Sequence, residues 1–432
     1  MLGNNWGPEF FSDVEHDRVR SPLQRIADET LEELAYFETV LKDFGCEVIR
    51  PEIDSNDRIQ DFIEQGEVPR NPMQPRDEQL ISGNKLYTTN TDNPSIVKRL
   101  LEYSEDITYF QDIYYDDAFY NERKHPGLAD EELYANFAGA DWPSYEYFCN
   151  NRKNPQAFEK HIYKELTTTL QKFPVDVPDQ HPWAKTPGHV KGLHFPSSAN
   201  SFLIGNDVYV SKGNDLSLAQ LEQVFPDTRI NVLLHGHTHS DGCFHPIKPG
   251  AILSLHDFQE YEKSFPGWEV SYLEGDLAPA VEPWRDLKRK QKGASSLGAA
   301  WWLPGEEKNN HLTHFVNEWL DNWVGYIEES VFDVNVLVLD KHHVCVSSLK
   351  NETLNAFLKK HKMEAIYIPW RHRYFWDGGL HCITLDLVRE GQKQDYFPDR
   401  KEPIRLAELE GGYKTWIPGS PHQVERPPQG LK

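Results

Sequence analysis

The chain has 432 residues, with 45 Lys and Arg against 68 Asp and Glu, so its formal net charge is −23. This acidity argues against a nucleic-acid-binding protein, because neutralising phosphates requires a positive face. Apolar residues make up 38% of the chain and aromatic residues 12%, enough for a folded core. No stretch approaches the roughly 18 uncharged apolar residues of a membrane helix, so no spanning segment is predicted.

The cysteines are odd in number, far apart and without CxxC spacing: Cys46, Cys149, Cys243, Cys345 and Cys382. This usage fits a reducing compartment better than a disulfide framework. The first residues show neither the basic stretch nor the apolar run of a secretion signal. We therefore expect a cytoplasmic protein in which all the cysteines except Cys382 serve packing.

Hydrophobic periodicity predicts helices that each lead into a strand. Apolar residues spaced by three and four predict a helix over Ser21–Phe44, which ends at Gly45, and a strand over Cys46–Pro51. The same unit recurs as helix Leu216–Phe225 with strand Ile230–Leu234, and as helix Glu352–His361 with strand Ala365–Pro369. Further strands are predicted over Gln79–Tyr87, Ser201–Val210, Ala251–Leu255, Val334–Leu339 and Leu380–Val388.

Strands and helices that alternate over the whole length indicate one large α/β domain of repeated modules. We expect this domain to span residues 21–415, after an N-terminal extension at 1–20. An acidic, aromatic segment at about 103–163 is predicted to be an insertion, and the proline-containing end at 416–432 an extended tail.

A histidine-rich segment follows the strand at Ile230–Leu234. His235, His237, His239, Asp241, Cys243 and His245 occupy alternate positions, so an extended strand would place them on one face as candidate metal ligands. Gly236-His-Thr-His239 resembles the closing motif of the metallophosphoesterases. Of that family's other motifs, only Asp-x-His has a counterpart in this chain, which is Asp179-Gln-His181. The alternative is ordinary packing of histidines at a strand end.

Two other segments carry candidate chemistry. Cys382 follows Gly378-Gly-Leu-His381, where glycines allow close approach of a ligand, and a thiolate there is a candidate nucleophile if a histidine lies near. Alternatively it is a buried structural thiol. Arg76 and Asp77 precede a predicted strand and a Gly83-Asn84 turn. They either form part of a site at a sheet edge or are charged residues beside a hairpin without a function in binding.

Taken in order, these motifs resemble the amidinotransferases, guanidine-modifying enzymes of the pentein fold. The resemblance rests on Pro-Arg-Asp at 75–77, on His239-x-Asp241-x-x-Phe244 with Pro-Gly at 249–250, and on Gly-Gly-x-His-Cys at 378–382. It extends from about Ser21 to Gly391. It implies a pentein fold, an α/β-propeller of repeated ββαβ modules in a single large domain.

The resemblance also implies roles for individual residues. Cys382 would attack the guanidinium carbon of a donor such as arginine and form an amidino-cysteine, while His239 would protonate the leaving amine and then deprotonate the amine acceptor. Asp77 and Asp241 would hold the guanidinium nitrogens. Arg76 and His381 are expected to help bind substrate. No metal or other cofactor is implied, and the partners are small molecules and, for assembly, a second copy of the chain in a homodimer.

Two positions depart from the family pattern. Asn200 stands where the family has a carboxylate that orients the catalytic histidine, and Phe258 stands where it has an arginine that binds a substrate carboxylate. Three alternatives stay open. They are a hydrolase of the same fold, in which water replaces the amine, a metallophosphoesterase-like metal site at His235–His245, and a binding protein that has kept the fold without the chemistry.

Overall fold

The computed structural model describes three stretches of the chain. These are residues 1–110 without 67, 84, 90–92 and 103–105, residues 197–273 without 212–220, 223, 234–238 and 256–260, and residues 301–403 without 302, 307, 321–322, 325–332, 377 and 392. Residues 144, 146, 150 and 170–172 are also described. The predicted insertion and tail, and also Phe258, thus lie largely or wholly outside the described residues.

The chain divides into two compact units. The first comprises Met1–Asp77, Ser197–Lys212 and Asp227–Lys432, and the second comprises Glu78–Pro196 and Gly213–Pro226. The residues of the proposed chemistry all belong to the first unit. Its described helices are η1 (Pro8–Phe11), α1 (Asp17–Asp43), α2 (Ile59–Gln65), α3 (Pro75–Glu78, which ends in the second unit), α10 (Ser240–Cys243), α11 (Tyr261–Ser264), α13 (Asn310–Trp319), α14 (Glu352–Lys360) and α15 (Arg373–Trp376).

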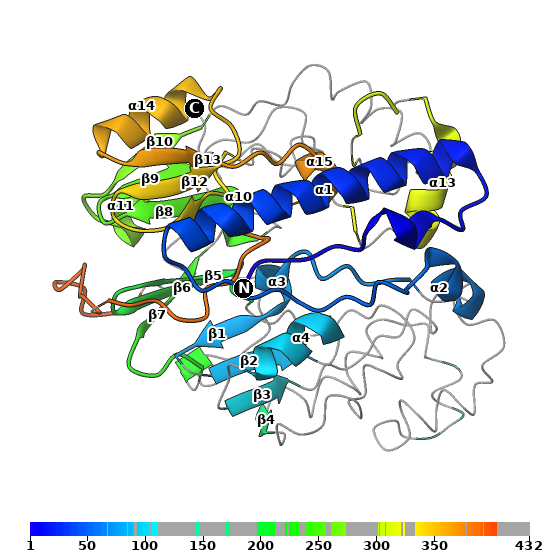
Figure 1. The fold of residues 1–432 in the computed structure, drawn as a ribbon. Coiled ribbons are helices and arrows are strands. Elements are labelled where there is room, and N and C mark those ends of the chain that lie inside the picture. The colour runs from blue at the N-terminus through cyan, green and yellow to red at the C-terminus, as the bar shows by residue number, and fades with distance from the viewer. Residues whose placement is uncertain are drawn as a thin grey trace. The chain divides into compact units, whose positions relative to one another are not determined.

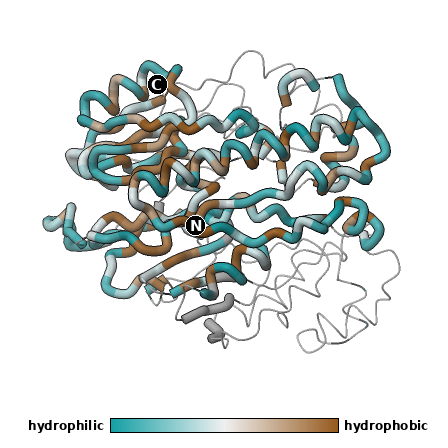
Figure 2. The backbone as a smooth tube through the Cα atoms, viewed as in Figure 1, coloured by the Kyte–Doolittle hydropathy of each residue, from teal (hydrophilic) through white to brown (hydrophobic). Residues whose placement is uncertain are grey.

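The long helix α1 confirms the first predicted helix, although it begins at Asp17 rather than Ser21. The ring of His16 caps it by accepting from the backbone N–H of Arg18, which satisfies a donor that the first turn leaves unpaired. Apolar residues recur along one face and are buried, among them Leu23, Ile26, Leu34 and Phe37; Figure 2 shows this alternation along the helix. Of the helices that the structure describes, none has the length and apolarity needed to cross a membrane.

The first twenty residues contribute to the hydrophobic cluster that α1 covers. Leu2, Trp6, Phe10 and Phe11 are all buried in it. Trp6 stacks on Phe10 with ring centroids 4.6 Å apart and on Trp323 at 5.5 Å. This segment therefore takes part in the core of the first unit.

The strand predicted over Cys46–Pro51 is wrong, because these residues form no strand in the structure. The segment instead runs beside the N-terminal residues through isolated contacts. The N–H of Leu2 donates to the carbonyl of Ile49, and the Arg50 side chain donates to the carbonyl of Gly3. A strand needs a continuous ladder of backbone pairs, and here a side chain makes part of the contact.

Among the residues that the structure describes, the first unit contains three sheets of the same topology (Figure 1). In each, two strands form an antiparallel hairpin and the third pairs in parallel with the second strand. The sheets are β5 (Ser201–Ile204), β6 (Asp207–Ser211) and β7 (Arg229–Leu233); β8 (Phe244–Lys248), β9 (Ala251–Ser254) and β10 (Glu269–Tyr272); and β11 (Leu337–Val338), β12 (His343–Val346) and β13 (Glu364–Tyr367). Helices α11 and α14 lie in the crossovers of the second and third sheets, as a parallel connection requires.

The second unit contains a fourth sheet built on the same plan. Strands β1 (Leu80–Ser82) and β2 (Lys85–Thr89) form a hairpin, helix α4 (Pro94–Leu101) follows, and β3 (Asp106–Phe110) pairs in parallel with β2. Strand β4 (Leu170–Lys172) adds an antiparallel edge. The prediction of an α/β fold of repeated ββαβ modules is thus confirmed by the described elements.

Most of the other predicted elements are confirmed, with shifted ends. The predicted strands at 230–234 and 365–369 and the helix at 352–361 correspond to β7, β13 and α14, and the segments at 79–87 and 201–210 each prove to be a hairpin. The helix predicted over Leu216–Phe225 lies mostly outside the described residues. The segment at 334–339 contains only the two residues of β11, and the strand predicted over Leu380–Val388 is wrong, as described below.

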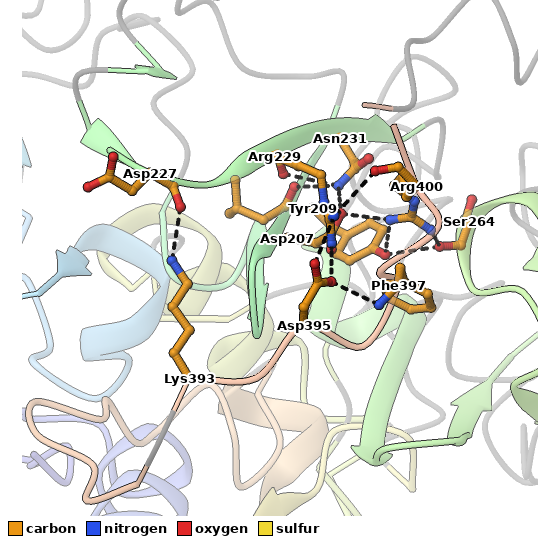
Figure 3. A network of polar contacts seen from close by, with 11 residues as sticks. Asp207, Tyr209, Asp227, Arg229, Asn231, Ser264, Lys393, Asp395, Phe397 and Arg400 are labelled. Atoms are coloured by element: carbon orange, nitrogen blue, oxygen red, sulfur yellow. Dashed lines mark hydrogen bonds and ion pairs between the residues drawn. The ribbon is translucent and has the colours of Figure 1, made fainter. Parts of the chain in front are cut away.

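Residues near 395–403 are tied to β6 and β7 by a polar network (Figure 3). The fully buried carboxylate of Asp207 accepts from Arg229 at 2.5 Å, from Arg400 at 2.7 Å and from Asn231 at 2.9 Å. Arg400 also donates to the backbone carbonyl of Ser264. One buried anion therefore joins the first two sheets of the unit to the C-terminal end of the described chain.

Candidate active site

Cys382 lies in a loop that follows α15, not in a strand. Residues 380–383 form turns, and Thr384 makes a single isolated bridge with Leu2. This segment forms no strand because a distant side chain, that of Arg76, binds its backbone carbonyls. The Nε of Arg76 donates to the carbonyls of His381 at 2.8 Å and Thr384 at 2.7 Å, which leaves no ladder for a neighbouring strand.

Arg76 is buried, and it makes a third contact with this loop. Its Nη2 donates to Oδ2 of Asp386 at 2.9 Å. Burial works to raise the pKa of Asp386, but the charge of Arg76 outweighs it and holds that pKa far below its usual range. The described contacts of Arg76 are therefore with the loop that carries Cys382. The substrate-binding role predicted for Arg76 stays a prediction.

Asp241 lies on the short helix α10, and its side chain is fully buried. Its Oδ2 accepts from Nδ1 of His381 at 2.6 Å and lies 3.6 Å from the Sγ of Cys382. Among the described residues, Oδ1 has no hydrogen-bond partner. Burial works to raise the pKa of Asp241, but the hydrogen bond and charge of His381, with the charges of His239 and Arg76, lower it below its ordinary value.

His381 is buried beside Asp241, and opposing effects act on its pKa. Burial and the charge of Arg76 lower the pKa of His381, although Asp241 works to raise it. A histidine ring whose Nδ1 contacts an ionised carboxylate donates the Nδ1–H to it, so His381 orients Asp241. This assigns to His381 a contact with a carboxylate of the site, while substrate binding by His381 itself stays a prediction.

The histidine-rich segment does not run as one extended strand. Residues 234–238, which include His235 and His237, lie outside the described residues, and α10 interrupts the segment at Ser240–Cys243. His245 lies on β8, where burial lowers its pKa well below the ordinary value. The alternation predicted to gather six ligands on one face is therefore wrong for the described part, because a helical turn breaks the period of two.

His239 immediately precedes α10 and lies near Asp77, which belongs to α3. Its Nδ1 is 3.6 Å from Oδ2 of Asp77, and its side chain is 37% exposed, in contrast to the buried Cys382. Within the described residues, a polar partner of His239 is thus Asp77. Asn200, predicted to orient His239, lies next to Ala199, whose carbonyl accepts from the N–H of Asp241. That role of Asn200 stays a prediction.

Asn335 is a site residue that the sequence analysis missed. Its Nδ2 donates to the Sγ of Cys382 at 3.0 Å, and its Oδ1 accepts from the backbone N–H of His381 at 2.9 Å and of Cys382 at 3.2 Å. The signal in the sequence is a lone amide between Val334 and Val336 in an apolar run. A polar residue at such a position is buried and needs partners.

The ligand atoms of Asp77, Asp241 and Cys382 lie within 4.8 Å of one another. Burial raises the pKa of the Cys382 thiol well above its ordinary value, and the charges of Asp241 and Asp77 raise it further. Two carboxylates facing one thiol form a site for a planar cation whose central atom the sulfur can attack, because carboxylates pair with guanidinium groups through parallel hydrogen bonds. The same three atoms could also bind a divalent metal ion.

Comparisons with known proteins find similar amidinotransferases. No family model matches the chain. Glycine amidinotransferase of Gallus gallus is 25% identical over 268 residues, which cover 58% of this chain and 52% of that protein, so the chain spans about half the length of this relative.

Two solved structures are similar at 18% identity. The amidinotransferase of saxitoxin biosynthesis from Microseira wollei has a TM-score of 0.43 with 85% of each chain covered. The inosamine-phosphate amidinotransferase of Streptomyces griseus has a TM-score of 0.45 with 91% of this chain and 93% of that chain covered. The sequence match, together with the order of motifs from Arg76 to Cys382, relates this chain to the amidinotransferase family.

Proposed function

We propose that the protein is an amidinotransferase that moves the amidino group of a guanidino donor, such as arginine, to an amine acceptor through Cys382. The observation that carries this proposal is the placement of the Asp77 and Asp241 carboxylates within 4.8 Å of the Cys382 sulfur. The relatives named above are amidinotransferases, which supports the same reaction class.

Binding would place the guanidinium between the two carboxylates. The Oδ1 of Asp241 is buried and has no partner among the described residues, so an N–H of the donor would satisfy it. Asp77 would hold the guanidinium from the side of His239. A cation held in this way would lie against the sulfur, because the Sγ of Cys382 is 3.6 Å from the Oδ2 of Asp241.

A bound guanidinium would favour formation of the Cys382 thiolate. In the absence of substrate, burial and the two carboxylates keep the pKa of Cys382 high, so the sulfur is a thiol at neutral pH. A guanidinium neutralises the carboxylates, and this lowers the cost of forming the thiolate. The sulfur is therefore most reactive when its substrate is in place.

The chemistry then proceeds in two balanced steps. In the first step the Cys382 thiol gives its proton to His239 and the sulfur forms a bond to the guanidinium carbon. The bond from that carbon to the substituted nitrogen breaks, and His239 passes the proton to the departing amine. In the second step an acceptor amine loses a proton to His239 and attacks the carbon, the C–S bond breaks, and His239 returns this proton to the sulfur. The partial exposure of His239 suits a base that meets both amines at the solvent side.

Intact-protein mass spectrometry after brief incubation with arginine and an acid quench would test the proposal. We expect the wild type to gain one amidino unit, and we expect Cys382→Ala to gain none. Cys46→Ala is a matched control, because Cys46 is exposed and outside the site, and it should form the adduct like the wild type. An adduct on Cys382→Ala, or none on the wild type with arginine and other guanidino compounds, would refute it.

Two further arms separate the alternatives. Adding an amine such as glycine should discharge the adduct faster than water does; discharge by water alone would identify a hydrolase of the same fold. Treatment with a chelator should leave adduct formation unchanged. Loss of activity with the chelator, together with metal bound to the purified protein, would instead assign the cluster of Asp77, Asp241 and Cys382 to a metal ion.

The setting of this reaction is also part of the proposal. Cys46, Cys243, Cys345 and Cys382 are free thiols in the structure, which supports a reducing compartment such as the cytoplasm. The partners would be a small guanidino donor and an amine acceptor, and assembly as a homodimer stays a prediction.

A further inference from the structure

We propose that Asn335 is a further active-site residue, which stabilises the Cys382 thiolate by donating a hydrogen bond to it and holds the sulfur facing Asp241. The inference rests on the proposed role of Cys382 as nucleophile. It assigns a function to the one polar side chain of the buried segment Val334–Val336.

The orientation of the Asn335 amide follows from its neighbours. Two backbone N–H groups, of His381 and Cys382, donate to one end of the side chain at 2.9 and 3.2 Å, so that end is the oxygen. The other end is therefore the NH₂ group. It contacts the Sγ of Cys382 at 3.0 Å and the backbone carbonyl of Asp241 at 3.2 Å, which uses both of its hydrogens.

Packing keeps the amide in this orientation. Asn335 is 2% exposed, and a Cβ placed on Gly379 would come within 2.5 Å of its Oδ1. The glycine thus leaves the space that the amide occupies. Rotation of the side chain would leave two backbone N–H groups unpaired in the interior, which costs free energy.

The contact favours the thiolate over the thiol. A thiol can donate to Oδ2 of Asp241, 3.6 Å away, but after deprotonation that contact becomes a repulsion between two anions. The N–H of Asn335 points at the sulfur in both states, and it interacts more strongly with the charged one. Together with the backbone at Gly379, Asn335 thus lowers the pKa of Cys382 against the effects of burial and the two carboxylates.

Alkylation by iodoacetamide tests this without any guanidino substrate. The rate for Cys382 is followed by peptide mass spectrometry as a function of pH in the wild type, in Asn335→Asp and in Asn335→Ser. Asp keeps an oxygen for the two backbone N–H groups but removes the donor to the sulfur. We expect its alkylation rate at pH 8 to fall about tenfold to a hundredfold, with the pH profile displaced upward. Ser, whose hydroxyl can still donate, should show a smaller loss.

Other residues of the same protein provide the controls. The exposed Cys46 should react at one rate in all variants, and the buried Cys345, whose pKa burial raises to about 12, should react only if the fold opens. Asn309→Asp removes a buried amide donor that contacts Arg18 and Glu306 instead of the sulfur, and should leave Cys382 unchanged.

The proposal is overturned if folded Asn335→Asp alkylates Cys382 with the wild-type rate and pH profile. It is also overturned if both Asn335 variants expose Cys345, because Asn335 would then be required for folding and not specifically for the thiolate. The amidino-transfer proposal fails on a different result, the absence of an adduct in the wild type. The two failures are therefore distinguishable.

Discussion

Asp241 has two opposite effects on Cys382, and the balance between them defines the site at the scale of single residues. Its charge raises the pKa of the Cys382 thiol and so disfavours the thiolate. The same charge, with an Oδ1 that has no hydrogen-bond partner among the described residues, would suit the proposed guanidinium. His381 maintains this state by occupying Oδ2, so that Asp241 is ionised and oriented before substrate arrives.

Asp241→Asn should therefore separate reactivity from catalysis. Removing the charge lowers the pKa of Cys382, so we expect iodoacetamide to react several-fold to about tenfold faster at pH 8, since one pKa unit changes the thiolate fraction tenfold. Adduct formation with arginine should fall about tenfold to a hundredfold, because a charge-assisted hydrogen bond is lost. Asn keeps an oxygen for the N–H of His381, which preserves the local geometry. A slower alkylation would show that the Asp241 charge does not restrain the thiol.

At the scale of elements, the site depends on close contact between the loop before Cys382 and the segment that leads into β11. Gly379 faces Asn335 at a distance that no larger residue allows. Gly378 is similarly close to Gln74, whose side chain donates to the carbonyl of Trp376. The two glycines therefore serve packing within the protein, in addition to the access for a ligand that their sequence suggests.

Gly379→Ala should disturb Asn335 directly. The added methyl group would meet Oδ1 at 2.5 Å and Cβ at 2.6 Å, so we expect a loss of about 1–3 kcal/mol in the free energy of unfolding, together with slower alkylation of Cys382. Gly242→Ala is the matched control, because a Cβ there meets no atom within 4 Å although Gly242 is the neighbour of Asp241. Urea denaturation of both variants is the measurement. Equal stability of the two would contradict the packing argument.

How far the sequence predicted these elements depends on how local their determinants are. Helices α1 and α14 were predictable because their apolar spacing and their caps lie within the elements, as with Asn351, which caps α14. The loop at 380–388 was not, because its carbonyls pair with Arg76, 305 residues away from His381 in the chain. Its apolar residues alternate as a strand's do, and only the long-range partner decides between the two structures.

At the scale of the whole molecule, the first compact unit assembles the site from four distant segments, at 76–77, 239–241, 335 and 381–382. Motif order along the chain predicted three of them by resemblance. Asn335 was not predicted as a site residue, because a single amide in an apolar run belongs to no motif. Only its contacts with Cys382 and His381 in the structure identify it. The geometry of the candidate site therefore depends on contacts between segments that are far apart in the sequence.

The polar network around Asp207 should contribute to that stability without touching the site (Figure 3). Asp207 is fully buried between Arg229 and Arg400, so Asp207→Asn would leave the largely buried Arg400 guanidinium without this anion and Arg229 with Asp395 alone. We expect this change to lower the free energy of unfolding by about 3 kcal/mol or more. Asp395→Asn is the matched control, since Asp395 pairs with the same Arg229 but its side chain is 31% exposed, and it should change stability little. Urea denaturation compares the two, while the alkylation rate of Cys382 in the folded variants should equal that of the wild type. If Asp207→Asn were no more costly than Asp395→Asn, the buried anion would not be what secures the end of the described chain to β6 and β7.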